Sequence, residues 1–381
     1  MNKSLRKVFV QIHLWLGLLS GAVVFVVCIT GCLYVFKDEI ADATQPWRFV
    51  DPQEKTVLSP SQILAVSDLE VGGKMPTAVT FGEKTDAVFV DYFQPGAGMS
   101  TVFLNPYDGQ VLKVVTKQVD GFDFFSFVLK GHRSLWLPRE IGSPIVSYSV
   151  LLFLVTLFTG IVLWFPKRWT RKAFVQRLIF KRPFTISRMN FLLHNVLGFY
   201  AAILLMILCF TGLVFGLSWF SQAVYAVTSG GKELKPYMLP QSDTLRVGLH
   251  DNKLLDRLYI RLRAEEPDAT IFYFALPTQS DGVFRVSIVH KRGSYYRTDN
   301  VFFDRYTLAP LKGSGPYAGK YREASFADQF RRMNLELHDG RFFGVWGKVL
   351  MFLASLVGAS LPVTGFIIWY KKRAKKWVAL K

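Results

Sequence analysis

The sequence predicts an integral membrane α-helical protein. We expect a four-helix transmembrane bundle built from a duplicated helix-module-helix unit, with two small α+β modules on the outer side of the membrane. Four stretches of roughly 20 or more residues are predominantly apolar, which is enough to cross a hydrocarbon core of about 30 Å. Basic residues are confined to short segments beside these stretches, and histidine and Thr-Gly positions recur in register along the chain. These three observations predict the fold class.

The four apolar stretches cover residues 9–36, 144–165, 190–220 and 344–370. The first has the basic start of a signal peptide, and Ala41-Asp42-Ala43 after it resembles a cleavage site. Its apolar run is too long for a signal peptide, and it matches the third stretch, which cannot be cleaved. We therefore expect an uncleaved anchor.

The net charge of +18 comes almost entirely from three segments, which are residues 1–8, residues 166–188 and the residues after Trp369. Together they hold 17 Lys and Arg and no Asp or Glu, so the charges of the remaining chain nearly cancel. Short basic segments mark the cytoplasmic side of a membrane protein. Both termini and the middle loop are predicted to be cytoplasmic, and little excess charge is left for nucleic acid, which we exclude as a partner.

This topology divides the chain into eight segments. The transmembrane helices are predicted at 1–37, 141–165, 190–220 and 338–370. The cytoplasmic segments are the basic loop 166–189 and the basic tail 371–381. The outer modules are residues 38–140 and 221–337.

The two outer modules show the same order of local patterns. Each begins with an amphipathic helical pattern, at 59–69 and 252–264, and continues with short alternating segments typical of strands. The strands are predicted at 77–81, 87–92, 101–104, 270–276, 283–290 and 301–303. Asn105-Pro106-Tyr107-Asp108-Gly109 has strong turn chemistry, and residues 302–311 resemble that hairpin.

Four of the six histidines occupy matched positions. His13 and His194 stand at the start of the first and third spans. Each is followed four residues later by a glycine, Gly17 or Gly198, and then by a Thr-Gly pair whose glycine is Gly31 or Gly212. At about 100° per residue these positions return to one face of a helix.

The second and fourth spans show a related pattern. His132 and His338 precede them, and a Thr-Gly pair follows 27 or 26 residues later, at Thr159-Gly160 and Thr364-Gly365. By topology His13 and His194 lie near the cytoplasmic face, whereas His132 and His338 lie near the outer face. His250 and His290 have no matched partner and are expected to be ordinary residues of the second module.

Two histidine pairs at two depths predict two bis-histidine haem b groups. Haem iron accepts axial imidazoles from opposite sides, and helix bundles form cofactor sites from side chains on facing helices. Glycines allow a porphyrin face to approach the backbone, although helix packing alone explains them too. Arg133 and Arg341 are candidates to pair with haem propionates. Copper is the alternative to haem, but no carboxylate or thiolate is placed to complete a tetrahedral metal site.

The three cysteines, Cys28, Cys32 and Cys209, all fall within apolar spans. They provide no disulfide framework for the outer modules, and the chain has no CxxCH motif for covalent haem. We interpret them as small buried residues.

Three motifs resemble the PepSY-associated transmembrane helix family of bacterial iron-regulated inner-membrane proteins. They are Ile12-His13-Leu14-Trp15-Leu16-Gly17 with Thr30-Gly31, Leu193-His194-Asn195 with Gly198, and Leu337-His338-Asp339-Gly340-Arg341-Phe342-Phe343-Gly344. The resemblance covers essentially the whole chain and is nearest to the FoxB-type ferric-siderophore reductases. It implies a four-span, di-haem inner-membrane protein with PepSY-like periplasmic modules, with haem ligation by His13, His132, His194 and His338.

The expected function is electron transfer across the membrane to reduce a ferric siderophore in the periplasm, so that iron is released. The cytoplasmic loop is too short for a nucleotide-binding domain and no GxGxxG follows a strand, so the donor is a membrane quinol or a separate cytoplasmic reductase. Two other functions stay open. One is a non-redox transporter or accessory protein whose histidines carry a metal ion or proton, and the other is a sensor or scaffold with structural haem.

Overall fold

The computed structural model describes residues 2–96, 98–118, 121–166, 170–179, 185–244 and 253–378. The chain forms two compact units, which are described separately. The helical unit contains Met1–Lys37, Phe124–Val224 and Asn334–Lys381, and the strand unit contains Asp38–Asp123 and Tyr225–Met333.

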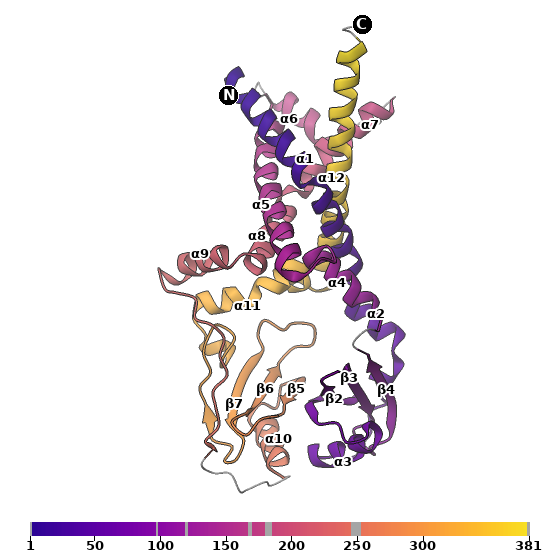
Figure 1. The fold of residues 1–381 in the computed structure, drawn as a ribbon, viewed down its shortest axis with the longest axis vertical. Coiled ribbons are helices and arrows are strands. Elements are labelled where there is room, and N and C mark those ends of the chain that lie inside the picture. Colours follow the sequence, from indigo (N-terminus) through magenta and orange to yellow (C-terminus); the bar gives the residue numbers. More distant parts are fainter. Residues whose placement is uncertain are drawn as a thin grey trace. The chain divides into compact units, whose positions relative to one another are not determined.

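Four long helices form the centre of the helical unit (Figure 1). They are α1 (Lys3–Tyr34), α5 (Arg139–Trp164), α8 (Gly198–Gly216) and α12 (Gly344–Val378). Helices α1 and α8 each pack against both α5 and α12, so the four helices make a closed bundle. Both chain ends lie at the same end of this bundle.

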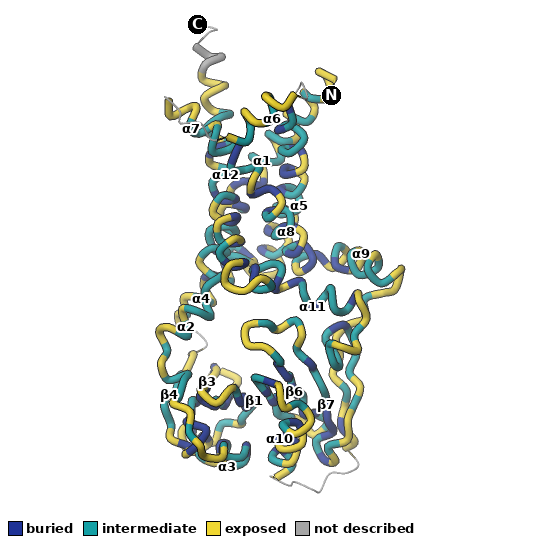
Figure 2. The backbone as a smooth tube through the Cα atoms, turned by 180° about the vertical axis from the view of Figure 1, so that it is seen from behind, coloured by how far each residue is buried: buried dark blue, intermediate teal, exposed yellow. Residues whose placement is uncertain are grey.

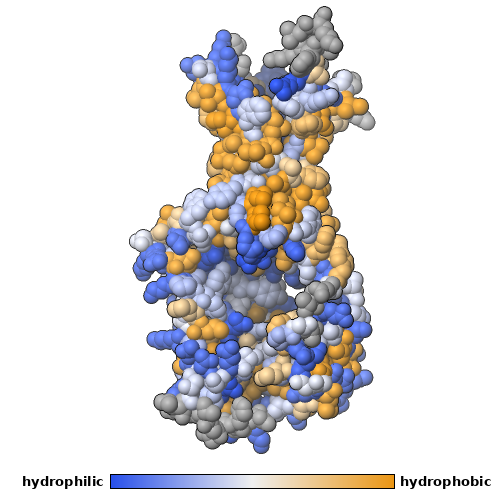
Figure 3. Space-filling model, in the orientation of Figure 1, coloured by the Kyte–Doolittle hydropathy of each residue, from blue (hydrophilic) through white to orange (hydrophobic). Residues whose placement is uncertain are grey.

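The described residues contain four helical segments that are long and apolar enough to cross a membrane: Lys3–Thr44, Arg139–Trp164, Ile186–Gly216 and Arg341–Ala374. Large apolar side chains such as Leu19 and Ile203 remain exposed on them, at 71% and 67%, and apolar residues gather over this unit in Figure 3. Helices that are apolar all round suit a lipid environment. The chain is a membrane protein, as the hydropathy predicts.

Short elements extend the bundle at both ends. At the end that carries the chain termini lie α6 (Arg171–Leu178), α7 (Ile186–Leu192) and a π-helical turn, η2 (Leu193–Leu197), which leads into α8. At the other end lie α4 (Phe124–Ser134), α9 (Ser218–Ser229), α11 (Phe326–Asp339) and η5 (Arg341–Phe343).

A tight turn joins α4 to α5. Leu135 and Trp136 have positive φ angles, which is a strained backbone for residues with side chains, and the Trp136 indole donates a hydrogen bond to the Phe127 carbonyl at 2.9 Å. A side chain at Gly131 would collide with the Trp136 ring. His132 therefore lies in the last turn of a helix that is followed at once by a fixed reversal into the second span.

The strand unit contains one open, antiparallel, eight-stranded sheet. Its strand order is β4-β3-β2-β1-β5-β6-β7-β8. The strands are β1 (Pro76–Phe81), β2 (Val88–Gln94), β3 (Gly98–Leu104), β4 (Val111–Lys117), β5 (Ile271–Ala275), β6 (Val283–Val289), β7 (Asp299–Asp304) and β8 (Pro310–Leu311). The six predicted strands are confirmed as β1, β2, β3, β5, β6 and β7, whereas β4 extends well beyond the predicted hairpin.

The expectation of two small modules needs correction, because the two segments share one sheet. Strand β1 of the first segment pairs with β5 of the second, with Val79 opposite Phe274. Helices α3 (Pro60–Val71) and α10 (Leu254–Glu265) contribute to a single hydrophobic core that includes Ile63 and Leu258. Pairing β1 with β5 removes an exposed edge from each half of the sheet. Figure 2 shows the buried residues of these strands.

Hairpin turns in the two halves use the same chemistry. In the first, Asn105 Oδ1 accepts a hydrogen bond from the Tyr107 amide at 3.0 Å; in the second, Asp304 Oδ1 accepts from the amides of Tyr306 and Thr307 at 3.0 and 2.9 Å. Burial alone would raise the pKa of Asp304, but these bonds and one from the Asp243 amide outweigh it and lower the pKa.

Of the remaining elements, α2 (Lys37–Thr44) crosses the boundary between the two units, and η1 (Pro46–Arg48) and η4 (Tyr321–Glu323) belong to the strand unit. Arg332, on α11, is 5% exposed and its guanidinium donates to the carbonyls of Pro316, Thr298, Ala318 and Gly319. This side chain fixes the loop between β8 and α11 within the strand unit.

Candidate cofactor site

The helical unit brings the four matched histidines together as two pairs. The first, called the His13 pair, consists of His13 on α1 and His194 in the π-helical turn, with ring centroids 6.3 Å apart and ring planes at 86°. A π-helical turn adds one residue to a helical turn and often occurs at functional sites. Here it carries one of the paired histidines.

The second pair, called the His132 pair, consists of His132 on α4 and His338 on α11. Its ring centroids are 6.2 Å apart and its ring planes lie at 67°. Each pair joins one histidine from the first half of the chain to one from the second. The structure therefore pairs His13 with His194 and His132 with His338, as predicted. The two pairs lie at two levels of the bundle.

Each histidine of the His13 pair is held by a Thr-Gly pair on a neighbouring helix. The His13 ring donates from Nδ1 to the Thr156 carbonyl at 3.0 Å, and Nδ1 lies 3.1 Å from Thr159 Oγ1. His194 Nδ1 lies 2.9 Å from Thr364 Oγ1. The Thr-Gly pairs of α5 and α12 thus contact the histidines at the start of α1 and in the π-helical turn.

The His132 pair is held in the same way by the other two Thr-Gly pairs. His132 Nδ1 donates to the Val27 carbonyl at 2.9 Å and lies 3.3 Å from Thr30 Oγ1. His338 Nδ1 lies 2.8 Å from Thr211 Oγ1. All four Thr-Gly pairs therefore contact a histidine.

The threonine hydroxyls determine which ring nitrogen carries the proton. Each hydroxyl donates to a carbonyl of its own preceding turn, for example Thr211 Oγ1 to Ile207 O at 2.6 Å and Thr364 Oγ1 to Ser360 O at 2.8 Å. The oxygen is then left to accept from the histidine, so Nδ1 is the protonated nitrogen and Nε2 keeps its lone pair. A metal-binding histidine commonly donates its other ring N–H to a neighbouring acceptor in this way.

The glycines of the Thr-Gly pairs pack directly on the imidazole rings. A Cβ atom at Gly160 would lie 3.0 Å from His13 Cε1, and at Gly365, 3.2 Å from His194 Cε1. The corresponding distances for Gly31 to His132 and Gly212 to His338 are 3.3 and 3.4 Å. A side chain at any of these positions would push on the ring, so glycine permits the close contact.

Gly17 and Gly198 lie one turn from their histidines but contact other helices. A Cβ at Gly17 would lie 3.6 Å from the Thr156 side chain of α5, and at Gly198, 3.1 Å from the Leu361 side chain of α12. The packing is therefore tight at Gly198 and ordinary at Gly17.

The two arginines expected to face a cofactor differ in their surroundings. Arg341 Nε forms an ion pair with Asp339 Oδ2 at 2.7 Å, and its amide donates to the same carboxylate, so its charge is largely neutralised. Arg133 is exposed on α4. Burial lowers the pKa of His132, and the charge of Arg133 lowers it further, which favours the neutral ring that binds metal.

The donor set of each pair is two imidazoles, which could hold one metal centre between them. Imidazole nitrogens bind a transition metal at about 2.0–2.1 Å, so two rings on opposite sides of one ion have centroids about 6 Å apart. Across the described residues, no three His, Cys, Asp or Glu side chains converge as a metal group would require. Two imidazoles and no third protein ligand match the axial positions of a haem.

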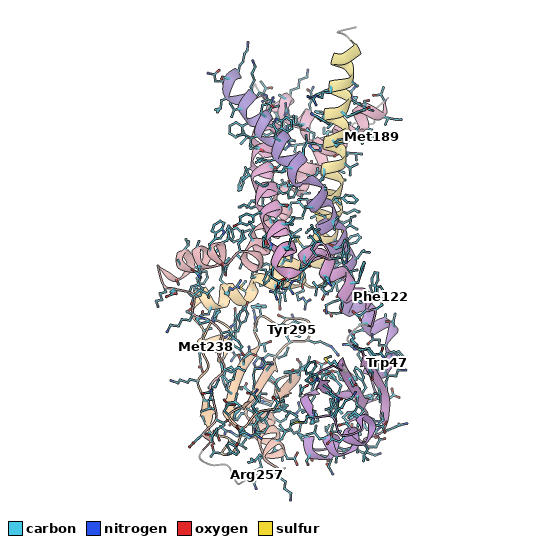
Figure 4. The ribbon with its side chains drawn as sticks, in the orientation of Figure 1. Trp47, Phe122, Met189, Met238, Arg257 and Tyr295 are labelled. Carbon is cyan, nitrogen blue, oxygen red and sulfur yellow. The ribbon has the colours of Figure 1, made fainter. Side chains whose placement is uncertain are left out.

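Two further site residues were not predicted. Asn190 Nδ2 donates to the Thr364 carbonyl at 3.0 Å, and Asn334 Nδ2 donates to the Thr211 carbonyl at 3.1 Å. A signal for both was present in the sequence, since Arg188-Met189-Asn190 and Arg332-Met333-Asn334 each precede a histidine by the same spacing. Figure 4 labels Met189, which directly precedes Asn190 in the sequence.

Of the remaining two histidines, the structure describes His290. His290 Nε2 bonds to Asp299 Oδ2 at 2.9 Å in the strand unit. His250 lies outside the described residues, as do Lys167, Arg168, Lys181 and Arg182 of the basic loop.

Comparison with known proteins finds one family. The family described as PepSY-associated TM region matches residues 10–372. No match was found among curated proteins.

Proposed function

Because the chain belongs to the PepSY-associated TM family, we propose that it is a di-haem oxidoreductase of the bacterial inner membrane that passes electrons to a ferric siderophore. The His13 pair and the His132 pair would each hold one haem b. The chain is a PepSY-family membrane protein, and the haem, the substrate and the FoxB-type activity are the parts that we propose.

One observation carries the proposal: the Nδ1 atom of all four paired histidines is already hydrogen-bonded. Nε2 is then the ring atom left to bind iron, and each ring is neutral, as an axial ligand must be. The centroid distances of 6.3 and 6.2 Å support one iron between the rings of each pair. The His13 pair and the His132 pair lie at opposite ends of the bundle. This arrangement supports electron transfer from one side of the membrane to the other.

The orientation is part of the proposal. The basic segments favour a cytoplasmic position for both termini, and the chain ends do lie at one end of the bundle (Figure 1). We place the His13 pair toward the cytoplasm and the His132 pair toward the periplasm, where the PepSY-like sheet would lie. The matched halves of the sequence support a duplicated unit.

Haem at the two pairs would supply one-electron redox chemistry. The protein's own residues fix the rings: Thr159 and Thr364 orient the His13 pair, and Thr30 and Thr211 orient the His132 pair. Reduction of the bound ferric ion to ferrous would release it, because hard oxygen ligands hold the ferrous ion less tightly. A membrane quinol or a separate cytoplasmic reductase would supply the electron.

The first test is the visible spectrum of the detergent-purified full-length protein, oxidised and then reduced, with haem quantified per chain. We expect two haems with six-coordinate spectra, and one haem in each of His13→Ala and His338→Ala. His290→Ala is the control, because its ring lies in the strand unit and should leave haem content unchanged.

Mixing the dithionite-reduced protein with a ferric siderophore tests the reductase activity separately. Reoxidation of the haems with formation of ferrous iron supports the proposal. Bound metal without porphyrin would instead favour a transporter, and haem that stays reduced would favour a sensor or scaffold. Unchanged haem content in both histidine variants would overturn ligation by these pairs.

A further inference from the structure

The tripeptide Arg-Met-Asn occurs before one histidine of each pair. Arg188-Met189-Asn190 precedes His194, and Arg332-Met333-Asn334 precedes His338, with asparagine four residues before histidine in both. Residues four apart share a helix face. Asparagine and histidine therefore reach the same neighbouring helix, although the first sequence runs through α7 and the π-helical turn and the second lies on α11.

Each asparagine contacts the threonine that holds its own histidine. Asn190 donates to the Thr364 carbonyl while His194 contacts the Thr364 hydroxyl. Asn334 donates to the Thr211 carbonyl while His338 contacts the Thr211 hydroxyl. One threonine is thus bound at two atoms by two side chains of the facing helix, and this fixes both the spacing and the rotation of the two helices.

The asparagine contacts are well shielded from water. Asn334 is 4% exposed and Thr211 is 3% exposed, and Asn190 is half-buried. If a buried amide group loses its acceptor, no hydrogen bond offsets the free-energy cost of removing that group from water. The hydrogen bond from asparagine to the threonine carbonyl is therefore favoured.

The position four residues before the other histidine of each pair is apolar. Phe9 and Val128 stand there before His13 and His132, and neither side chain can donate a hydrogen bond. The Nδ1 atoms of His13 and His132 instead donate to backbone carbonyls, Thr156 O at 3.0 Å and Val27 O at 2.9 Å.

We propose that Asn190 and Asn334 are positioning residues, which hold His194 and His338 in place through Thr364 and Thr211. The inference rests on the proposed haem ligation. Each asparagine acts on one cofactor site only, since their threonines belong to different pairs.

The test replaces each asparagine in the full-length protein by leucine, which has a similar branched shape and no donor. Asn190→Leu is expected to weaken haem retention at the His13 pair by about 10–100-fold, the range for loss of a group that orients a metal ligand, and to shift its midpoint potential and low-spin bands. The His132 pair should be unchanged. Asn334→Leu should give the reverse pattern, so each variant is the control for the other.

Backgrounds with one haem allow the two sites to be observed separately. In His132→Ala/His338→Ala only the His13 pair remains, and in His13→Ala/His194→Ala only the His132 pair remains. Asn190→Ala and Asn334→Ala serve if a leucine variant fails to fold, because alanine removes the donor without adding bulk or charge. Equal effects of one substitution on both haems, or none on either, would overturn the inference while leaving the proposed function intact.

A readout that needs no haem separates the two proposals completely. The histidine Cε1–H atom exchanges with deuterium, and mass spectrometry measures its rate residue by residue. His194 Cε1 and His338 Cε1 pack on Gly365 and Gly212, so Asn190→Leu should accelerate exchange at His194 alone, and Asn334→Leu at His338 alone. If the wild-type protein contains no haem, ligation fails, and unchanged exchange rates in both variants would then overturn the positioning role as well.

Discussion

Thr211 and His338 are 127 residues apart in the chain, and the threonine hydroxyl accepts a hydrogen bond from the imidazole Nδ1 at 2.8 Å. The same hydroxyl donates to the Ile207 carbonyl of its own helix. A single methyl-for-hydroxyl replacement therefore tests whether the histidine tautomer depends on threonine.

We expect Thr211→Val to weaken haem binding at the His132 pair by about 10–100-fold. Valine keeps the branched shape but removes the hydroxyl that accepts from Nδ1–H, and loss of one hydrogen bond of this kind costs about 0.5–1.5 kcal/mol. Haem titration of the apoprotein measures the change. Thr364→Val is the matched variant and should act on the His13 pair alone; loss at both pairs would show general unfolding instead.

Substitution of the Thr-Gly glycines by alanine should act in order of distance from the ring. Gly160→Ala, with the new Cβ 3.0 Å from His13 Cε1, should reduce haem content most, whereas Gly212→Ala, at 3.4 Å from His338 Cε1, should reduce it least. Overpacking of this kind costs about 1–3 kcal/mol. The number of haems per chain in each purified variant measures the order of these reductions.

Gly17→Ala is the control for this series, because its Cβ would meet Thr156 at an ordinary 3.6 Å. A stronger effect of Gly17→Ala than of Gly160→Ala would contradict the role of the ring contacts. That result would mean that helix spacing near Gly17 controls the site.

Much of the candidate site was predictable because its signals are local. Helical periodicity alone relates His13 to Gly31 and His194 to Gly212, and hydropathy predicts the four spans. The partners of those residues are not local. The Asn334 amide meets Thr211 across 123 residues, and no pattern within either helix determines that contact, although the repeated Arg-Met-Asn was visible.

The sheet illustrates the same limit. Alternation of apolar residues predicts that 77–81 and 270–276 are strands, but it does not specify which edges will pair. The merging of both segments into one sheet depends on the fit of Val79 against Phe274, which is a tertiary property. Two separate modules were therefore the simpler expectation, and it was wrong.

Phe274→Ala should destabilise the strand unit strongly. The side chain is fully buried next to the β1–β5 pairing, and removal of a buried phenylalanine side chain costs about 3–5 kcal/mol. Denaturant titration of the full-length protein, followed by tryptophan fluorescence, measures it. Phe93→Ala is the control, since Phe93 is 55% exposed and should change stability little. An equal loss of stability in Phe274→Ala and Phe93→Ala would contradict a hydrophobic core at the β1–β5 pairing.

Stability of the strand unit should fall in acid because of Asp304. Hydrogen bonds from three backbone amides outweigh burial and lower the pKa of this carboxylate. Its contribution is therefore fully present above the ordinary carboxyl pKa of about 3.9 and is lost as the pH falls through the lower pKa of the folded protein.

Asp304→Asn should consequently be less stable than wild type at pH 7, by about 1–3 kcal/mol, and the difference should narrow toward pH 3. Denaturation midpoints at the two pH values measure this. Glu70→Gln, at an exposed carboxylate on α3, is the control and should have the same stability as wild type at both pH values. If Asp304→Asn and wild type differed by the same free energy of unfolding at both pH values, the pKa argument would be contradicted.

The strand order β4-β3-β2-β1-β5-β6-β7-β8 reads the same from either edge, with β1 and β5 antiparallel at the centre. Two identical polypeptides, each supplying a helix, four strands and a second helix, would assemble about a two-fold axis into this same order. A homodimer of half-chains would then place one histidine of every pair on each subunit. Separated from each other, the two halves of this chain would each expose an unpaired β edge and keep one histidine of each pair.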